Sequence, residues 1–475
     1  MRYRLLLTLL FLLLAAPARA QQTAAGEMTP IYLPLVAGMP AVANNLYITS
    51  STYLGGSGVD TASAVAIADD LTILVAGSFP ALTAPSAESY TLIDGPGTII
   101  RLDSQGRSIL SITRMGTVIN DMEMGPSSRP VICGDFGVAV MRPTLDAVVW
   151  RATPGVVLRC AIGSDGTVAA LVGNNVLIYS ALGAQMISFS AGGTLAYDVA
   201  VSDESQRAIV TGYAQADGQP CGQLQIAYLR AYDYTGALAW QDYSFTNDQA
   251  GAANLCADTR GERVTIGAEG KLYLVGSING GTGESVFARE PRAFDTALPD
   301  FKRVSTDSFT DPFNVGSVKT AWFGRFDPAN GALEVSQTLL TRLRTNNKGN
   351  SISIRAIAVD NVGRVVITGD AACCIRDRDT RAIANLTVGS YESGEAFYMA
   401  LSPDLRTRSV WTTFARPGMS AGGSPGTAIA LRNGRAVLVG NFTQKVDTAR
   451  GIITVAPLQE VPVGDGDAML MVIPQ

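Results

Sequence analysis

The chain has 475 residues, a formal net charge of −5 at pH 7 and no histidine. The missing histidine excludes Ser-His-Asp and Cys-His activation of a nucleophile and removes the commonest catalytic zinc ligand. The mildly acidic charge gives no broad attraction to nucleic acid, and no nucleic-acid motif is present. We therefore expect no nucleic-acid partner, and any general acid–base chemistry would depend on carboxylates.

The N-terminal residues 1–20 have the pattern of a secretory signal peptide. Arg2 and Arg4 precede an apolar run from Leu5 to Ala16, and Ala18-Arg19-Ala20 follows. A membrane anchor is the alternative, but the run is shorter than the roughly 20 residues that span a bilayer. We expect a protein that is secreted to the extracellular space, the cell surface or the periplasm, with no membrane span and with residues 21–43 as a linker.

From residue 57 onward one pattern recurs seven times, and it begins with an apolar hairpin whose second strand stops at glycine. Each hairpin turns at a polar or Gly-containing pair, which is the sequence signature of a β-hairpin. The seven hairpins span Ala62–Ser78, Val118–Gly134, Leu158–Gly173, Tyr197–Gly212, Glu262–Gly276, Ile354–Gly369 and Thr427–Gly440. A repeat of this length indicates one repetitive architecture in place of two or three separate domains.

Two further strands follow each hairpin except the last, which has only Asp467–Gln475. A partnerless strand lies at the other end of the chain, at Asn45–Tyr53, and joining the two would close a ring. The alternatives are a solenoid or two stacked sandwiches. Neither explains why the last repeat lacks one strand while the N-terminal end has one additional strand. The sequence therefore predicts an all-β fold, a single seven-bladed β-propeller of four-stranded antiparallel blades over residues 44–475. The expected blades are 57–116, 117–155, 156–193, 194–247, 248–342, 343–418, and 419–475 completed by 44–56.

One stretch carries a family resemblance. Ser51-Thr52-Tyr53-Leu54-Gly55-Gly56-Ser57-Gly58, followed by Asp60, Ala64-Val65-Ala66 and Leu74-Val75-Ala76-Gly77, resembles the bacterial seven-bladed β-propeller repeat family (SBBP). Gly464-Asp465-Gly466-Asp467-Ala468 resembles the same family's entry to its third strand. The resemblance implies a secreted or surface-exposed bacterial propeller, usually without assigned chemistry.

The long insertions join strand two to strand three or one blade to the next, so all should emerge on one face. Loops on a rigid scaffold commonly carry function, and the longest of these insertions, at 278–318, mixes aromatic and basic residues. The predicted binding residues are Arg289, Arg292, Phe294, Phe301, Arg303, Arg342, Arg344, Arg376 and Arg378. Guanidinium groups would bind carboxylate or sulfate groups, and phenyl rings would contact a sugar or peptide. The alternative is a loop that buries its phenyl rings in a small core and pairs its arginines with nearby aspartates.

Six cysteines in an exported chain are expected to form disulfides. The expected blade boundaries place Cys133 near Cys160 and Cys221 near Cys256, on the face that carries the long insertions. We therefore predict these two disulfides. Cys373 and Cys374 are adjacent, with Cα atoms about 3.8 Å apart, below the usual disulfide span of about 4.4–6.8 Å. They form either a strained eight-membered ring or bonds to other partners; we favour the ring.

These features favour a secreted, monomeric propeller that binds a carbohydrate, peptide or protein through the loops of one face without catalysis. A carboxylate-based glycan hydrolase or lyase on that face is the first alternative, so enzymatic activity stays open. A structural or adhesive envelope protein is the second. A quinone bound at Cys373-Cys374 is disfavoured because the repeated tryptophan pattern of quinoprotein propellers is missing. No recognised calcium loop is present, and we expect no metal and no cofactor.

Overall fold

The computed structural model describes residues 45–280, 284–311, 316–389, 391, 394–419, 421–443 and 450–474. The predicted signal peptide (1–20) and linker (21–43) lie outside these residues. The described residues are mainly β-strand, with one α-helix, α1 (Asn247–Ala252), and four 3-10 helices, Pro126–Ser128, Val286–Ala288, Ser308–Thr310 and Arg378–Thr380. None of these helices is long and apolar enough to cross a membrane. The prediction of an all-β protein is confirmed.

Most of the described strands belong to seven sheets of four or five strands. The first four sheets contain β3 (Thr61–Ile67), β4 (Ile73–Ser78), β6 (Gly97–Leu102), β7 (Ile109–Met115) and β5 (Glu88–Ile93); β8 (Ile119–Met124), β9 (Pro130–Gly134), β10 (Gly137–Met141) and β11 (Val148–Ala152); β12 (Arg159–Ile162), β13 (Val168–Val172), β14 (Asn175–Tyr179) and β15 (Gln185–Ser190); and β16 (Leu195–Ser202), β17 (Arg207–Gln215), β18 (Gln225–Asp233) and β19 (Leu238–Asp242).

The other three large sheets follow the same order along the chain. They contain β20 (Asp258–Ile266), β21 (Leu272–Asn279), β25 (Lys319–Phe326), β26 (Leu333–Leu339) and β24 (Arg303–Val304); β29 (Ile352–Val359), β30 (Val365–Ala371), β33 (Glu395–Leu401) and β34 (Arg408–Thr413); and β35 (Gly426–Arg432), β36 (Arg435–Phe442), β37 (Asp467–Pro474) and β2 (Ser50–Leu54). Every predicted hairpin is present, with its two strands antiparallel.

Three small sheets are formed by segments that connect the strands of the large sheets or precede them. They are formed by β1 (Asn45–Leu46), β31 (Ala382–Ile383) and β32 (Leu386–Thr387); by β22 (Arg289–Glu290) and β23 (Ala293–Ala297); and by β27 (Thr341–Arg342) and β28 (Gly349–Asn350). Two predicted insertions also add an outer fifth strand to a large sheet. β5 runs parallel to β7, and β24 runs parallel to β26. The sequence analysis treated both segments as loops.

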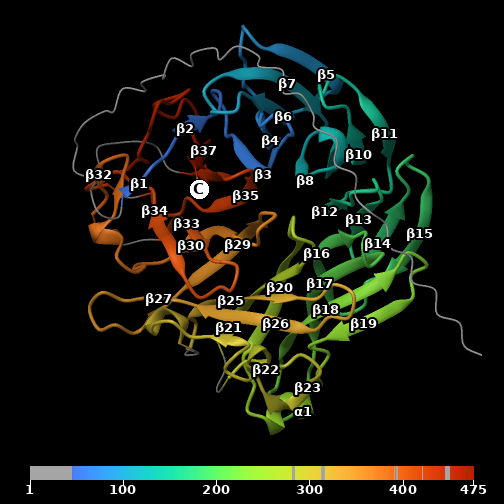
Figure 1. Cartoon of the computed structure of the whole chain (residues 1–475). Helices are drawn as coiled ribbons and strands as arrows, with labels where there is room; N and C mark the ends of the chain where they lie inside the picture. The colour runs from blue at the N-terminus through green and yellow to red at the C-terminus, as the bar shows by residue number, and fades with distance from the viewer. Residues whose placement is uncertain are drawn as a thin grey trace, which may run out of the picture. The chain divides into compact units, whose positions relative to one another are not determined.

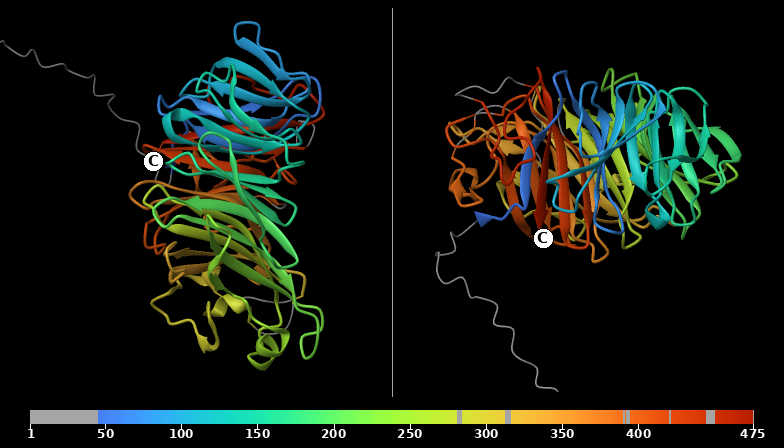
Figure 2. Two further views of the ribbon diagram at one scale, coloured as in Figure 1. Left: turned by 90° about the vertical axis from the view of Figure 1, so that its right-hand side faces the viewer. Right: turned by 90° about the horizontal axis from the view of Figure 1, so that it is seen from above.

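The last large sheet is built from both ends of the described chain. β2 pairs antiparallel with β37 over five residue pairs, from Ser50 opposite Val472 to Leu54 opposite Ala468. The blue strand β2 lies beside the red strand β37 in Figure 1 and again in the views of Figure 2. The predicted partnership of the two terminal strands is confirmed, although β2 begins at Ser50, five residues later than expected.

The large sheets pack face to face in chain order. Each pair of neighbours encloses a hydrophobic cluster: Val75, Ile100 and Leu470, for example, belong to the cluster shared by the first and last sheets. The other six clusters of the described residues lie between successive sheets. The first strands also contact one another in the order β3, β8, β12, β16, β20, β29 and β35, and β35 contacts β3. Figure 1 shows these sheets following one another around a centre, a β-propeller-like arrangement.

We expected each second strand to stop at a glycine, but only β9 ends there, at Gly134; five of the others continue past the glycine, as β30 does past Gly369. A β-bulge in the first strand explains why these positions hold glycine. Six of the seven first strands shift register near their start, as β29 does between Ile354 and Ala356. The bulge brings the first-strand backbone close to that glycine, so a Cβ at Gly369 would lie 1.9 Å from the Ser353 carbonyl oxygen. β12 pairs without a bulge. The glycine of its sheet, Gly173, lies in a turn with φ +57° and has nothing within 4 Å of a Cβ position.

Candidate functional site

A cavity of about 700 Å³ lies among the first strands of the seven large sheets. Its walls come from β3, β8, β12, β16, β20, β29 and β35, and from turns that join first to second strands, including Asp69, Ser164 and Asn361. The predicted insertions contribute no residue to this lining. This cavity is therefore built by strands and by the turns between first and second strands, which lie on the face opposite to the one that we predicted from loop length.

Five carboxylates line the cavity, and the backbone of a neighbouring sheet holds three of them. The N–H of Cys160 donates to Asp121 Oδ2 at 3.2 Å, and the N–H of Ile162 donates to Glu123 Oε2 at 3.0 Å. The N–H of Val264 donates to Asp198 Oδ2 at 3.0 Å. These bonds satisfy donors on the open edge of a first strand, which would otherwise lack partners. These acidic side chains therefore join neighbouring sheets and line the cavity at the same time.

Four arginines line the same space. Arg432 pairs with Asp69, and the other three come from β12, β20 and β29. Arg159 on β12 lies 4.0 Å from Asp121, measured from its Nη1 to Oδ1. Arg263 on β20 donates from Nε to the Arg355 carbonyl oxygen at 2.7 Å. Arg355 itself is the bulge residue of β29, and it is exposed. Its guanidinium makes no hydrogen bond or ion pair with any of the described residues, so it can receive an anionic group.

Burial changes the protonation of these groups. It raises the pKa of Glu123 to about 8, assisted by the charges of Asp121 and Asp198 and opposed by the Ile162 hydrogen bond. Burial also raises the pKa of Asp198, although Arg263 and Arg159 oppose the shift. It lowers the pKa of Arg263. Near pH 7 the cavity therefore contains a largely protonated Glu123 that can donate a hydrogen bond.

The structure divides the predicted binding residues into separate groups. Arg292 donates from Nε to Asp242 at 2.6 Å and lies over the Trp240 ring. Arg289 Nη2 lies 4.0 Å from Glu284 Oε2. Arg289, Arg292 and Phe294 all belong to the β22–β23 hairpin. Phe294 contacts the Phe245 ring edge-on, with centroids 6.4 Å apart. This group packs near the fourth sheet.

A second group surrounds Cys373 and Cys374. Arg342 donates to the Ser308 carbonyl oxygen at 2.8 Å and pairs with Asp311 at 3.2 Å. Arg344 lies 3.7 Å from the Cys374 sulfur, and Arg376 pairs with Asp307 at 2.7 Å. Most of these arginines are therefore used in internal bonds.

The last three predicted residues differ widely in exposure. Arg378 is 1% exposed, and it donates to Thr413, Gly389 and Ala415. Arg303 forms part of the short strand β24, which pairs with β26. Phe301 is 70% exposed. A ligand-binding role for the nine residues stays a prediction, and Phe301 presents the freest aromatic surface among them.

The loop also forms a small core, as the alternative interpretation anticipated. Phe287 stacks on Trp322 with ring centroids 4.3 Å apart and planes 5° apart. Asp307 pairs with both Arg376 and Arg408. Although burial works in the other direction, Arg408 and Arg376 hold the pKa of Asp307 below its ordinary value. This carboxylate is therefore ionised, and it does not suit the role of a general acid.

Two of the three predicted disulfides are present. Cys221 and Cys256 are bonded with Cα atoms 5.2 Å apart, and Cys373 and Cys374 form the adjacent ring. The predicted Cys133–Cys160 bond is wrong for this structure, in which both are buried free thiols. The Cys160 thiol instead donates to the Asp121 carbonyl oxygen at 3.9 Å, and burial raises the pKa of both thiols, which disfavours the thiolate that oxidation requires.

The sequence analysis did not select the cavity residues, although a signal was present. The first strands carry charged residues at inner positions: Asp121, Glu123, Asp198, Arg263 and Arg355. Charges at equivalent positions of successive repeats point to a common centre in a ring of sheets. Searching loops for length and basic residues drew attention away from them.

No family model and no curated protein matches the chain. Among solved structures, a chain of a structure described as "Crystal Structure of Mitotic Checkpoint Complex" is similar to it at 8% sequence identity. The alignment covers 90% of this chain and 96% of the other, with a TM-score of 0.45. The class that the sheets define is an all-β, β-propeller-like protein with a polar cavity among its first strands.

Proposed function

We propose that this protein is an exported, seven-bladed, closed β-propeller of the SBBP type that binds a ligand in its central cavity without catalysis. The closed ring is supported by the cyclic contacts of the first strands and by the β2–β37 pairing. The succession of seven large sheets along the chain supports the proposed division into blades. Export and the monomeric state are inferred from the N-terminal sequence pattern and from the absence of any feature in the sequence that requires a partner.

The observation that carries the proposal is the alternation of acidic and basic side chains around one cavity. Acidic groups from β8 and β16 are interspersed with the guanidinium groups of Arg159, Arg263 and Arg355. A volume of about 700 Å³ lies within the range of small-ligand pockets, roughly 300–1,000 Å³. Of the predicted ligand classes, a peptide with both charged signs matches these walls best, because opposite potentials complement one another.

The test is native mass spectrometry with a library of tetrapeptides that each contain one acidic and one basic residue. Acetylated and amidated neutral tetrapeptides are the matched controls. Arg355→Gln should abolish retention of the charged peptides, because its guanidinium has no structural bond to lose. Arg151→Gln, an exposed arginine on β11, should retain them. Equal retention by the two variants would refute the assignment of the cavity.

Export has a separate test. The proposal requires cleavage after Ala20, so the mature protein recovered outside the cytoplasm should begin at Gln21. An intact mass that includes residues 1–20 would contradict it.

A second candidate function, hydrolysis of a glycan by carboxylates, is favoured by the raised pKa of Glu123. Glycosidases use a protonated carboxylic acid as general acid together with a second carboxyl group, and Asp121 and Asp198 line the same cavity as Glu123. Turnover of a panel of p-nitrophenyl glycosides that is lost in Glu123→Gln would establish this function. A protein that binds none of these peptides or sugars would fit the structural or adhesive alternative.

A further inference from the structure

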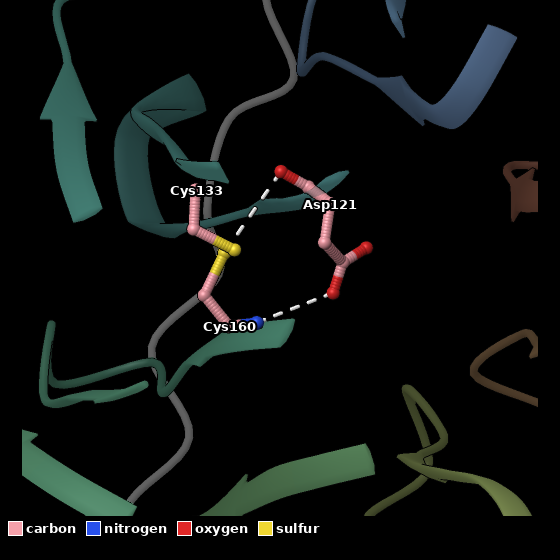
Figure 3. A group of neighbouring side chains, drawn as sticks. All are labelled: Asp121, Cys133 and Cys160. Carbon is pink, nitrogen blue, oxygen red and sulfur yellow. Dashed lines mark hydrogen bonds between the residues drawn. The ribbon is translucent and has the colours of Figure 1, made fainter. Parts of the chain in front are cut away.

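Asp121, Cys133 and Cys160 form a compact group at the boundary between two neighbouring sheets. Their ligand atoms, one carboxylate oxygen and two sulfurs, all lie within 4.8 Å of one another. Figure 3 shows the two sulfurs beside the Asp121 side chain, with the Cys160 N–H bonded to the carboxylate. The three residues come from β8, β9 and β12, so regular strands fix their positions.

The surroundings suit a bound cation. Cys133 is fully buried and Cys160 is 3% exposed, within a cluster that includes Val131, Val138 and Leu177. Asp121 and Cys160 also line the cavity, which provides a path for an ion and for a water molecule. The Met122 N–H donates to Asp121 Oδ1 at 3.0 Å, and so the carboxylate is oriented by backbone donors from two strands.

The charges of the group also balance. A divalent cation with two thiolates and one carboxylate has a net charge of −1, and the Arg159 guanidinium lies 4.0 Å from Asp121. A charge-neutral assembly reduces the cost of burying an ion. Ligand bonds of about 2.0–2.3 Å in a tetrahedral site place the ligand atoms about 3.3–3.8 Å apart. No two of the three atoms would therefore have to approach by more than about 1.5 Å, since all lie within 4.8 Å of one another.

The geometry points to a binding site for one thiophilic divalent cation of the Zn²⁺ class. The two sulfurs and an Asp121 oxygen would be its protein ligands, and water from the cavity would occupy the fourth position. Sulfur donors select such ions over Mg²⁺ and Ca²⁺, which prefer oxygen alone. Binding would release the two thiol protons to solvent. Such a site departs from the expectation, drawn from the sequence, that the protein binds no metal.

The test is a titration with Co²⁺, which reports on sulfur ligands by its absorption spectrum. The full-length protein is used with its Cys221–Cys256 and Cys373–Cys374 disulfides intact, so that Cys133 and Cys160 are its free thiols. We expect one equivalent to bind, with sulfur-to-cobalt charge-transfer absorption and d–d bands of tetrahedral intensity, and Zn²⁺ should displace it. Cys133→Ser and Cys160→Ser should each eliminate the charge-transfer band or halve it. Arg159→Gln, which removes only an outer partner, should weaken binding by about 10–100-fold.

Matched variants distinguish the loss of a metal ligand from a loss of folding. Asp121→Asn should lose affinity, whereas Asp146→Asn, the same change in a turn of the same large sheet, should bind as the wild type does. Circular dichroism melts of the metal-free variants show which of them are folded, and only folded variants are compared. A folded wild-type protein whose Cys133 and Cys160 are free thiols but which binds no Co²⁺ would overturn the proposal. A Cys133→Ser/Cys160→Ser double variant that keeps the charge-transfer band would also overturn it. Peptide mapping that finds Cys133 bonded to Cys160 in the exported protein would do so as well.

Discussion

Glu123 illustrates how a single carboxyl group links the cavity to stability. Its folded pKa, about 8, is above the ordinary value of 4.5, so the folded state binds a proton more tightly than the unfolded state. The stabilisation is present in full below about pH 4.5, and it is lost as the pH rises to about 8. A tenfold difference in proton affinity between the two states corresponds to about 1.4 kcal/mol of free energy.

We therefore predict that the free energy of unfolding of the wild type falls by a few kcal/mol more than that of Glu123→Gln between about pH 4.5 and pH 8. The glutamine keeps an oxygen to accept the Ile162 N–H, so the structure should be retained. Urea unfolding at a series of pH values measures the difference between the two proteins. Parallel pH profiles would show that Glu123 has an ordinary pKa.

Arg378 and Phe301 were predicted from the sequence to share one role, and the structure separates them. Arg378→Met should destabilise the protein by about 3 kcal/mol, because the carbonyl groups of Gly389 and Ala415 lose a buried charged donor. Phe301→Ala should change stability by less than about 0.5 kcal/mol, as is usual at exposed positions. Urea unfolding at pH 7 compares the two variants, and a reversed order would contradict the burial of Arg378.

For single residues, the sequence predicted which residue types gather in the insertion but not whether their side chains are buried, paired or exposed. It indicated that arginines and phenylalanines gather in one insertion, but it could not distinguish a guanidinium in solvent from one with three internal acceptors. That distinction depends on which carbonyl groups the folded loop leaves open, as the bonds of Arg378 show. The same reason explains why the charges of β8, β16 and β20 were overlooked.

Among the strands and loops, the repeated glycines at or near the ends of the second strands provide a direct comparison. Gly369→Ala should destabilise the protein by about 3 kcal/mol, because the new methyl group would meet the Ser353 carbonyl oxygen across the bulge. Gly173→Ala should cost about 1 kcal/mol, from its left-handed backbone alone. Thermal and urea unfolding measure both variants. Equal losses would indicate that the bulge does not determine the need for glycine.

The Cys221–Cys256 bond links the insertion of the fourth sheet to the loop after α1. It closes a segment with a sequence separation of 35, so replacing both cysteines by serine should cost about 3–4 kcal/mol by the chain-entropy estimate. Replacing Cys373 and Cys374, with a separation of 1, should cost much less. Unfolding under non-reducing conditions tests both changes, and a larger loss for the second pair would contradict this account.

The hairpins were predictable because apolar alternation and turn residues are local signals. The parallel outer strands β5 and β24 were not, since each depends on contact with a distant strand, β7 or β26. The bulges were also invisible as such, although their glycines were recognised as a repeated stop. Long-range pairing and backbone irregularity are the features that a periodic pattern does not encode.

For the molecule as a whole, the β2–β37 pairing predicts how the chain responds to truncation. Removing residues 1–56 deletes β2 and leaves β37 as an open sheet edge, so we expect a lower melting temperature and aggregation. Removing residues 1–43 keeps β2 and should leave the melting temperature unchanged. Light scattering during a thermal ramp distinguishes the two. A truncation at residue 56 that melts as the wild type does would mean that β2 is dispensable.

The partnership of the terminal strands was the clearest long-range feature of the sequence, because a strand was missing at one end and present at the other. The cavity could not be sized from the same pattern. Its volume depends on how closely the first strands approach, and therefore on the small side chains, such as Ala64 and Ala428, that line it.

The pairing of β2 with β37 also determines when the last large sheet can form during synthesis of the chain. Ser50 is made early, but Val472, its partner, is among the last residues to be synthesised. At about 5–20 residues per second, synthesis from Ser50 to Val472 takes about 20–85 seconds, and β2 is without its partner strand for that time. During that interval a nascent chain that meets a second copy could pair β2 in trans, and a cell that makes this protein at high density must keep neighbouring nascent chains apart until each C-terminus emerges.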